Sequence, residues 1–178
     1  MPATWQSQTR GMCWTTTSTD CELHLTMNDV ESFLAHAIQL EREAARRYEE
    51  LRAAMQTEGN ADLKAFFARM AHFSRKHLAE AQERGGFRSL PAMAPEEFEW
   101  PEGTSPETAE WAGVDAQMDA LDALQLALAS ERRGHAYYAA IAATTPDAEL
   151  SHLAGEFAAE EAQHVVELEK LIADRSAA

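Results

Sequence analysis

Residues 34–55 read LAHAIQLEREAARRYEELRAAM, and one set of positions in this stretch recurs at alternating intervals of three and four residues. The recurring positions are Leu34, Ala37, Glu41, Ala44, Tyr48, Leu51 and Met55. This spacing matches the 3.6-residue period of an α-helix with one face turned toward a core. Asn28 followed by Glu31 forms a capping-box pattern, so we expect the helix to begin there and to run to Gly59.

Three later stretches repeat this period. Between Asn60 and Gly85 the shared face holds Leu63, Phe67, Met70, Ser74, His77 and Ala81. Between about Asp115 and Ala143 it holds Leu121, Leu124, Leu128, Glu131, His135 and Tyr138. After Thr145-Pro146, and until about Asp174, it holds Leu150, Phe157, Glu161, His164, Leu168 and Leu171. We therefore expect four long helices and no strand.

The segment between the second and third helices, about residues 85–114, contains four prolines and is a poor host for a long helix. Within it, Ser105-Pro106 is suited to start one short helix that continues to Trp111. The predicted fold is an all-α four-helix bundle, built from two antiparallel hairpins joined by this crossover. The bundle spans residues 28–174, between an irregular N-terminal arm (1–27) and a short tail (175–178).

Composition narrows the classes of function. The 178 residues include 15 Lys and Arg against 30 Asp and Glu, a formal net charge of −15, so nucleic acid and anionic membrane surfaces would be repelled. No apolar run approaches the roughly 20 residues needed to span a bilayer, and no secretory signal pattern is present. We expect a cytoplasmic protein without a disulfide framework, because both cysteines, Cys13 and Cys21, lie in the N-terminal arm.

The informative positions are those where the core-facing stripes carry polar residues. Glu41, Glu131 and Glu161 occupy inward positions, and a buried carboxylate costs several kcal/mol unless a counter-charge meets it. His77 and His164 lie on the same inward faces. Each residue alone has an ordinary reading as a hydrogen-bonded core group, but their convergence is typical of a metal site in a bundle core. Carboxylate and imidazole ligands suit iron or manganese, with zinc as a further candidate.

The chain resembles a known family at these residues. Four segments are similar to those of the ferritin-like diiron proteins, and of rubrerythrins most closely. They are Glu41 to Tyr48, Phe66-Phe67 leading to His77, Glu131 to Tyr138, and Phe157 leading to Glu161-x-x-His164. The resemblance implies terminal carboxylates at Glu41 and Glu131, a bridging carboxylate at Glu161 and imidazole ligands at His77 and His164. It also implies one or two iron ions.

One position departs from the family pattern. Ser74 stands three residues before His77, where the family has a second bridging glutamate. Two divalent ions carry four positive charges, and the three inward glutamates supply three negative ones. Three remedies are open: an external anion or hydroxide bridges the ions, Glu80 reaches in from one turn away, or one ion alone binds tightly. His135, four residues after Glu131, is a candidate neutral ligand, although a hydrogen bond to Glu131 or Tyr138 is the simpler reading.

Two inward tyrosines, Tyr48 and Tyr138, are expected either to orient carboxylate ligands through their hydroxyl groups or to fill the core. Tyr137 is expected to face away from the core, and His36, like His24, His72 and His152, to be solvated.

The resemblance implies an oxidoreductase that reduces peroxide or dioxygen, or that oxidises ferrous iron. The alternative is a metal-binding or interaction protein with a degenerate site and no turnover. The cysteines lack the Cys-x-x-Cys spacing of a rubredoxin-type site, so an enzyme of this kind would need a separate electron donor. Family members commonly dimerise, so we also expect a homodimer.

Overall fold

The computed structural model describes residues 27, 29–55, 60–101, 103–108 and 118–177. This part of the chain forms long helices and one short 3-10 turn and contains no β-strand. The elements are α1 (Val30–Ala54), α2 (Ala61–Gly85), η1 (Pro95–Glu97), α3 (Ala120–Thr144) and α4 (Ala148–Ser176). The predicted all-α class is confirmed. None of these helices is both long enough and apolar enough to cross a lipid bilayer.

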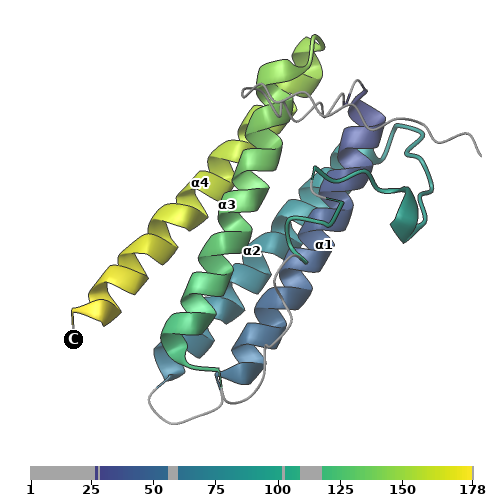
Figure 1. The fold of residues 1–178 in the computed structure, drawn as a ribbon. Helices are drawn as coiled ribbons and strands as arrows, with labels where there is room; N and C mark the ends of the chain where they lie inside the picture. The colour runs from purple at the N-terminus through teal and green to yellow at the C-terminus, as the bar shows by residue number, and fades with distance from the viewer. Residues whose placement is uncertain (1–26, 28, 56–59, 102, 109–117, 178) are drawn as a thin grey trace, which may run out of the picture.

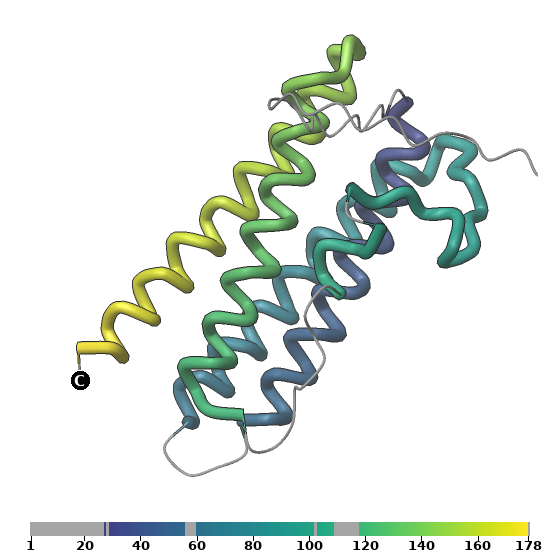
Figure 2. Tube along the Cα trace, viewed as in Figure 1, coloured from purple at the N-terminus to yellow at the C-terminus, as the bar shows by residue number. Residues whose placement is uncertain are grey.

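The helices pack as two pairs, α1 against α2 and α3 against α4 (Figure 1). Each pair is an antiparallel hairpin, and the two hairpins lie side by side, as predicted. The crossover leaves the end of α2 and returns toward the middle of α1 (Figure 2). Two contacts place its last described residues, 103–108, against α1 and α3: the Ser105 hydroxyl donates to Glu43, and Arg133 donates to the Pro106 carbonyl.

The helix starts differ from the predicted ones by a few residues. The Asp29 carboxylate, rather than Asn28, caps α1 by accepting from the Ser32 N–H at 2.7 Å. Asp119 caps α3 and Asp147 caps α4 in the same way. The predicted starts at Asp115 and at Thr145-Pro146 were therefore too early. An aspartate is as good a cap as Asn or Thr, and the sequence offers several candidates within one turn.

The helix ends and the termini differ as well. Helix α1 stops at Ala54, not at Gly59, and α4 continues to Ser176, past the predicted end at Asp174. Residues Ser105–Thr108 form a turn rather than the start of a helix. The rest of that predicted short helix, both cysteines, and the N-terminal arm apart from Met27 lie outside the described residues.

Two hydrophobic clusters form the core, one toward each end of the bundle. One contains Leu51, Phe67, Leu124 and Leu168, and the other contains Phe33, Leu34, Tyr138 and Phe157 among its members. Leu121 is 39% exposed, contrary to its predicted inward position, because it lies in the first turn of α3 at the edge of the bundle. The polar inward residues occupy a layer between the two clusters, so both ends of that layer are sealed by apolar side chains.

His36 was predicted to be solvated but is buried. Its Nδ1 lies 2.8 Å from the Ser32 carbonyl oxygen, and its ring makes edge contacts with Phe98 and Trp100 of the crossover, each with ring centroids 5.1 Å apart. Trp100 also packs on Tyr137, which is buried rather than outward-facing as predicted. The crossover therefore covers part of the surface that α1 and α3 would otherwise expose.

This packing predicts a pH dependence of stability. Burial lowers the pKa of His36 below its ordinary value of 6.5, so below that pH the unfolded chain takes up a proton that the native ring resists. The contribution of His36 is complete above pH 6.5, and the free energy of unfolding falls as the pH drops below it. We expect the free energy of unfolding of His36→Gln, measured by urea unfolding between about pH 5 and 8, to lack the fall below pH 6.5 that is due to His36. If the free energy of unfolding varied with pH in the same way in both proteins, His36 would not be the source of this pH dependence.

Candidate metal centre

Three of the predicted ligands meet between α3 and α4. Glu131, Glu161 and His164 each offer a ligand atom, and these atoms lie within 4.8 Å of one another. His164 Nδ1 is 3.1 Å from Glu131 Oε2 and 3.6 Å from Glu161 Oε2. Glu161 and His164 are three residues apart on α4 and therefore share one face of the helix, and Glu131 faces them from α3. Both carboxylates are buried.

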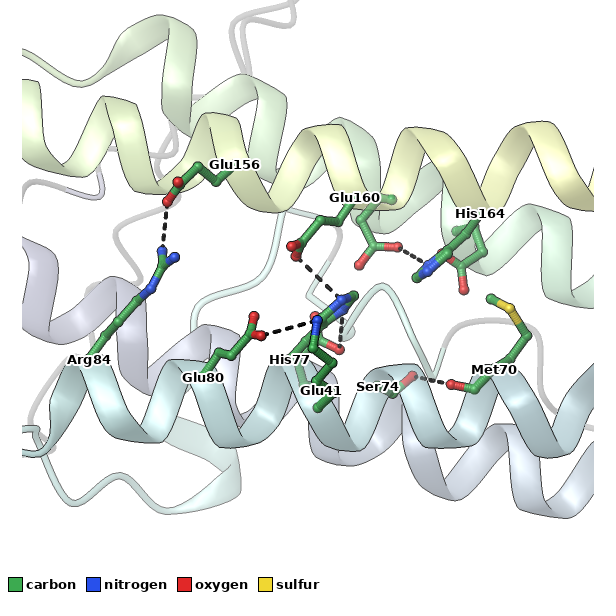
Figure 3. A network of polar contacts seen from close by, with 12 residues as sticks. Glu41, Met70, Ser74, His77, Glu80, Arg84, Glu156, Glu160 and His164 are labelled. Atoms are coloured by element: carbon green, nitrogen blue, oxygen red, sulfur yellow. Dashed lines mark hydrogen bonds and ion pairs between the residues drawn. The ribbon is translucent and has the colours of Figure 1, made fainter.

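The other two predicted ligands, Glu41 on α1 and His77 on α2, lie across the bundle from this group. His77 Nδ1 is 3.9 Å from Glu41 Oε2. The rings of His77 and His164 are stacked, with centroids 5.7 Å apart, so the two hairpins meet at these imidazoles (Figure 3). The five residues thus form one continuous polar cluster to which each of the four helices contributes.

The pKa values in the cluster reflect buried carboxyl groups that repel one another. Burial raises the pKa of Glu41 well above its ordinary value, and the charges of Glu107 and Glu131 raise it further. Burial, followed by the charge of Glu131, also raises the pKa of Glu161. Charges of one sign gathered in a region of low dielectric favour either proton uptake or a bound cation.

The pKa values of Glu131 and His164 shift in the directions opposite to those that burial favours, because the two side chains form an ion pair. Burial alone would raise the pKa of Glu131, but hydrogen bonds with Glu161, His164 and Tyr48 bring it below its ordinary value. Burial would lower the pKa of His164, but its hydrogen bond with Glu131 raises it. For His77, burial together with the charge of His164 outweighs the nearby carboxylates and lowers its pKa to about 4. Its ring is therefore neutral at neutral pH, which is the form that binds metals.

One oxygen in the cluster lacks a well-formed hydrogen bond among the described residues. Glu41 Oε1 is fully buried and makes no hydrogen bond of ordinary geometry, although the nearby Tyr138 hydroxyl partly offsets the rise that burial causes in the pKa of this carboxyl group. Buried polar atoms are nearly always paired, and an exception calls for a ligand, an ion or water. The carboxyl group of Glu41 lies beside His77 inside the bundle (Figure 3). A cation bound at this layer would give the Glu41 oxygen a partner.

The two inward tyrosines make different contacts. The Tyr48 hydroxyl donates to Glu131 Oε1, so it fixes the orientation of that carboxylate, leaving Oε2 toward His164. The Tyr138 hydroxyl is buried and has no hydrogen-bond partner among the described residues, and its ring packs on Phe33 and Phe157. Tyr138 is thus a core residue whose hydroxyl also lies near the Glu41 carboxyl group and partly offsets the burial that raises the pKa of that group, although the two make no hydrogen bond of ordinary geometry.

Ser74, the remedy candidate Glu80 and the possible extra ligand His135 do not join the five-residue cluster. Ser74 is buried and donates to the Met70 carbonyl oxygen at 3.3 Å, so it offers no carboxylate (Figure 3). Glu80 forms an ion pair with Lys76 at 3.3 Å, and its side chain is 38% exposed. His135 is partly exposed and lies outside the Glu131, Glu161 and His164 group.

Two carboxylates near the cluster were not predicted. Glu160 Oε2 lies 3.5 Å from His77 Nε2 (Figure 3), and it also lines a pocket of about 230 Å³ whose other walls are Glu80, Arg84, Glu156, Phe157 and Ala159. Glu107 on the crossover is 2% exposed. Glu160 was not predicted because the helical spacing assigns one inward position per turn, and its neighbour Glu161 occupies that position. Glu107 belongs to a proline-rich segment that has no helical period to interpret.

Replacing Tyr48 by Phe tests the hydroxyl contact with Glu131. We expect Tyr48→Phe to lower the free energy of unfolding by about 1–3 kcal/mol, because a buried carboxylate oxygen loses its donor. Tyr137→Phe is the matched control, since the Tyr137 hydroxyl is also buried but has no partner among the described residues. Its removal should be neutral or stabilising. Urea unfolding of both variants measures the difference, and equal losses would refute a specific role for the Tyr48 hydroxyl.

Comparison with known proteins identifies a relative of the same architecture. No family model matches the chain, and no curated protein matches it. The crystal structure of an uncharacterized conserved protein from Magnetospirillum magnetotacticum MS-1 matches with 40% sequence identity and a TM-score of 0.68. The match covers 82% of this chain and 95% of the other. The chain therefore belongs to the same protein family as this conserved Magnetospirillum protein.

Proposed function

We propose that the chain is a metal-binding protein of the ferritin-like, rubrerythrin-like type, and that it holds iron in the layer between its two hydrophobic clusters. The observation that carries this proposal is the convergence of Glu131, Glu161 and His164 within 4.8 Å, with Glu41 and His77 facing them. Carboxylate and imidazole ligands from facing helices form the usual metal site of such bundles.

The donor set fits a divalent first-row metal. Oxygen and nitrogen donors without thiolate suit iron and manganese, and zinc is compatible with the same ligands. The buried carboxyl groups repel one another, and Oε1 of Glu41 has neither a well-formed hydrogen bond nor a cation beside it among the described residues. A cation at this layer would relieve both. Glu131, Glu161 and His164 would hold a first ion, and Glu41 and His77 would take part in a second site or complete the first.

The chain's own residues support such a centre in three ways. Tyr48 holds the Glu131 carboxylate in one orientation, which is how neighbouring groups tune metal ligands. The apolar clusters above and below the layer keep bulk water out. Glu160, which lines a pocket on one side of the bundle, lies 3.5 Å from His77 and adds a carboxylate beside that ring.

Bound iron supplies one-electron redox chemistry, which suits the reduction of peroxide or dioxygen, or the oxidation of ferrous iron. The alternative function is metal binding without turnover. Ser74 favours this alternative, because it is buried at the position where the family has a bridging carboxylate and donates its hydroxyl to the Met70 carbonyl oxygen. The missing bridge should change the spacing and the potential of a pair of ions.

Metal titration tests the binding proposal. We expect the metal-free protein to bind Fe²⁺ without oxygen, and Mn²⁺ in air, when measured by calorimetry and elemental analysis. Glu161→Gln should weaken binding by about tenfold or more, because the carboxylate is lost where the three donors meet. Glu169→Gln, an exposed α4 residue paired with Arg132, is the control and should bind as the unmodified protein does. Equal binding by all three proteins, or by none, would refute the site.

Reaction with peroxide separates the two functions. We expect the Fe²⁺-loaded protein to consume hydrogen peroxide, with a change in its absorption spectrum, at a rate well above that of free Fe²⁺. The Glu161→Gln variant, loaded under the same conditions, should react no faster than free Fe²⁺. A loaded protein that binds iron yet shows neither spectral change nor consumption of peroxide would establish the alternative without turnover.

A further inference from the structure

Glu107 is buried in a segment that should favour exposure. It lies on the crossover, where the neighbouring Gly103 and Thr104 are exposed, yet only 2% of Glu107 is accessible to solvent. Connecting segments normally run over the surface, and a carboxylate on them normally faces water. Its burial therefore needs a reason.

The crossover is fastened to two helices on either side of Glu107. The Ser105 hydroxyl donates to the Glu43 carboxylate on α1, and Arg133 Nε on α3 donates to the Pro106 carbonyl oxygen at 3.0 Å. The Thr108 N–H donates to the Ser105 carbonyl oxygen at 2.9 Å and closes a turn around Glu107. These contacts direct the side chain inward between α1 and α3.

Helix α3 makes room for this carboxylate. Gly134 lies one turn after Glu131 and is buried. A Cβ atom at this position would lie 3.7 Å from Glu107 Oε1 and 3.6 Å from the carboxyl carbon of Glu161. The carboxyl groups of Glu107 and Glu161 thus both lie against the bare backbone of Gly134. A side chain longer than a methyl group would compete with them for this space.

The contacts at Gly134 place the Glu107 carboxyl group beside that of Glu161, and the electrostatics of Glu107 agree with this position. Burial raises the pKa of Glu107 well above its ordinary value, and the charge of Glu131 raises it further; Arg133 and Arg47 oppose this shift without reversing it. In turn, Glu107 is the neighbouring charge with the largest effect on Glu41, whose Oε1 is buried without a well-formed hydrogen bond.

We propose that Glu107 is the fourth carboxylate ligand of the centre, supplied by the crossover in place of the glutamate that Ser74 replaces. This inference rests on the proposed metal-binding function. With Glu107, the negative charges of Glu41, Glu107, Glu131 and Glu161 equal the four positive charges of two divalent ions. A metal-bound Glu107 would also tie residues 103–108 to the core, so metal binding orders this part of the crossover.

The experiment compares three variants of the full chain. Glu107→Gln removes the charge at nearly constant volume, and Glu96→Gln removes an exposed carboxylate from the same crossover as the matched control. The double variant Ser74→Glu/Glu107→Gln moves the fourth carboxylate to α2. Metal-free protein is titrated with Mn²⁺, and with Fe²⁺ without oxygen, for affinity and stoichiometry. Hydrogen exchange of residues 103–108 is measured with and without Mn²⁺, and circular dichroism confirms folding.

We expect Glu107→Gln to weaken the binding of at least one ion by about tenfold or more, and Glu96→Gln to leave it unchanged. The double variant should recover stoichiometry or affinity. Mn²⁺ should slow exchange at residues 103–108 in the unmodified protein but not in either variant that lacks Glu107. If Glu107→Gln binds metal as the unmodified protein does, and its hydrogen exchange at residues 103–108 responds to Mn²⁺ in the same way, Glu107 is not a ligand. The proposed metal site would still stand. An unmodified protein that binds no metal would overturn both proposals.

Discussion

Mutual repulsion among buried carboxyl groups is the constraint around which this bundle is organised. Glu41, Glu107, Glu131 and Glu161 are each at most 5% exposed, and they lie in a layer between two apolar clusters where water cannot screen them. Such an arrangement is costly unless cations, donors or protons compensate it. Tyr48 and His164 compensate Glu131. The remaining groups retain raised pKa values, so the layer suits a bound cation.

The fold was largely predictable because each helix carries its own period. Inward positions in α1 and α2, from Leu34 to Ala81, could be assigned from the three-and-four spacing alone, and the structure buries them. The same spacing located the central polar residues, because Glu and His stand out where Leu or Ala is expected. Helix ends were less predictable, since Asp29, Asp119 and Asp147 each stand close to other residues that cap equally well.

The rest of the site could not be predicted because it depends on how the crossover folds back. His36 and Tyr137 lie beside the inward stripes, and Trp100 of the crossover packs over both. Glu107 has no periodic neighbours to mark it as inward. Its direction is set by contacts from Glu43 and Arg133, which are distant in sequence. Tertiary contacts of this kind leave little trace in local spacing.

Gly134 also bears on how this chain can evolve or be engineered. Glycine within a helix costs roughly 1 kcal/mol relative to alanine, so a search for stabilising changes would select this position early. Alanine fits, because its Cβ would meet Glu107 and Glu161 at ordinary contact distances. Any bulkier residue would gain helix stability at the expense of the acidic layer. Variation at residue 134 should therefore be confined to glycine and alanine, and either residue there would mark homologues that retain the inward-facing crossover carboxylate.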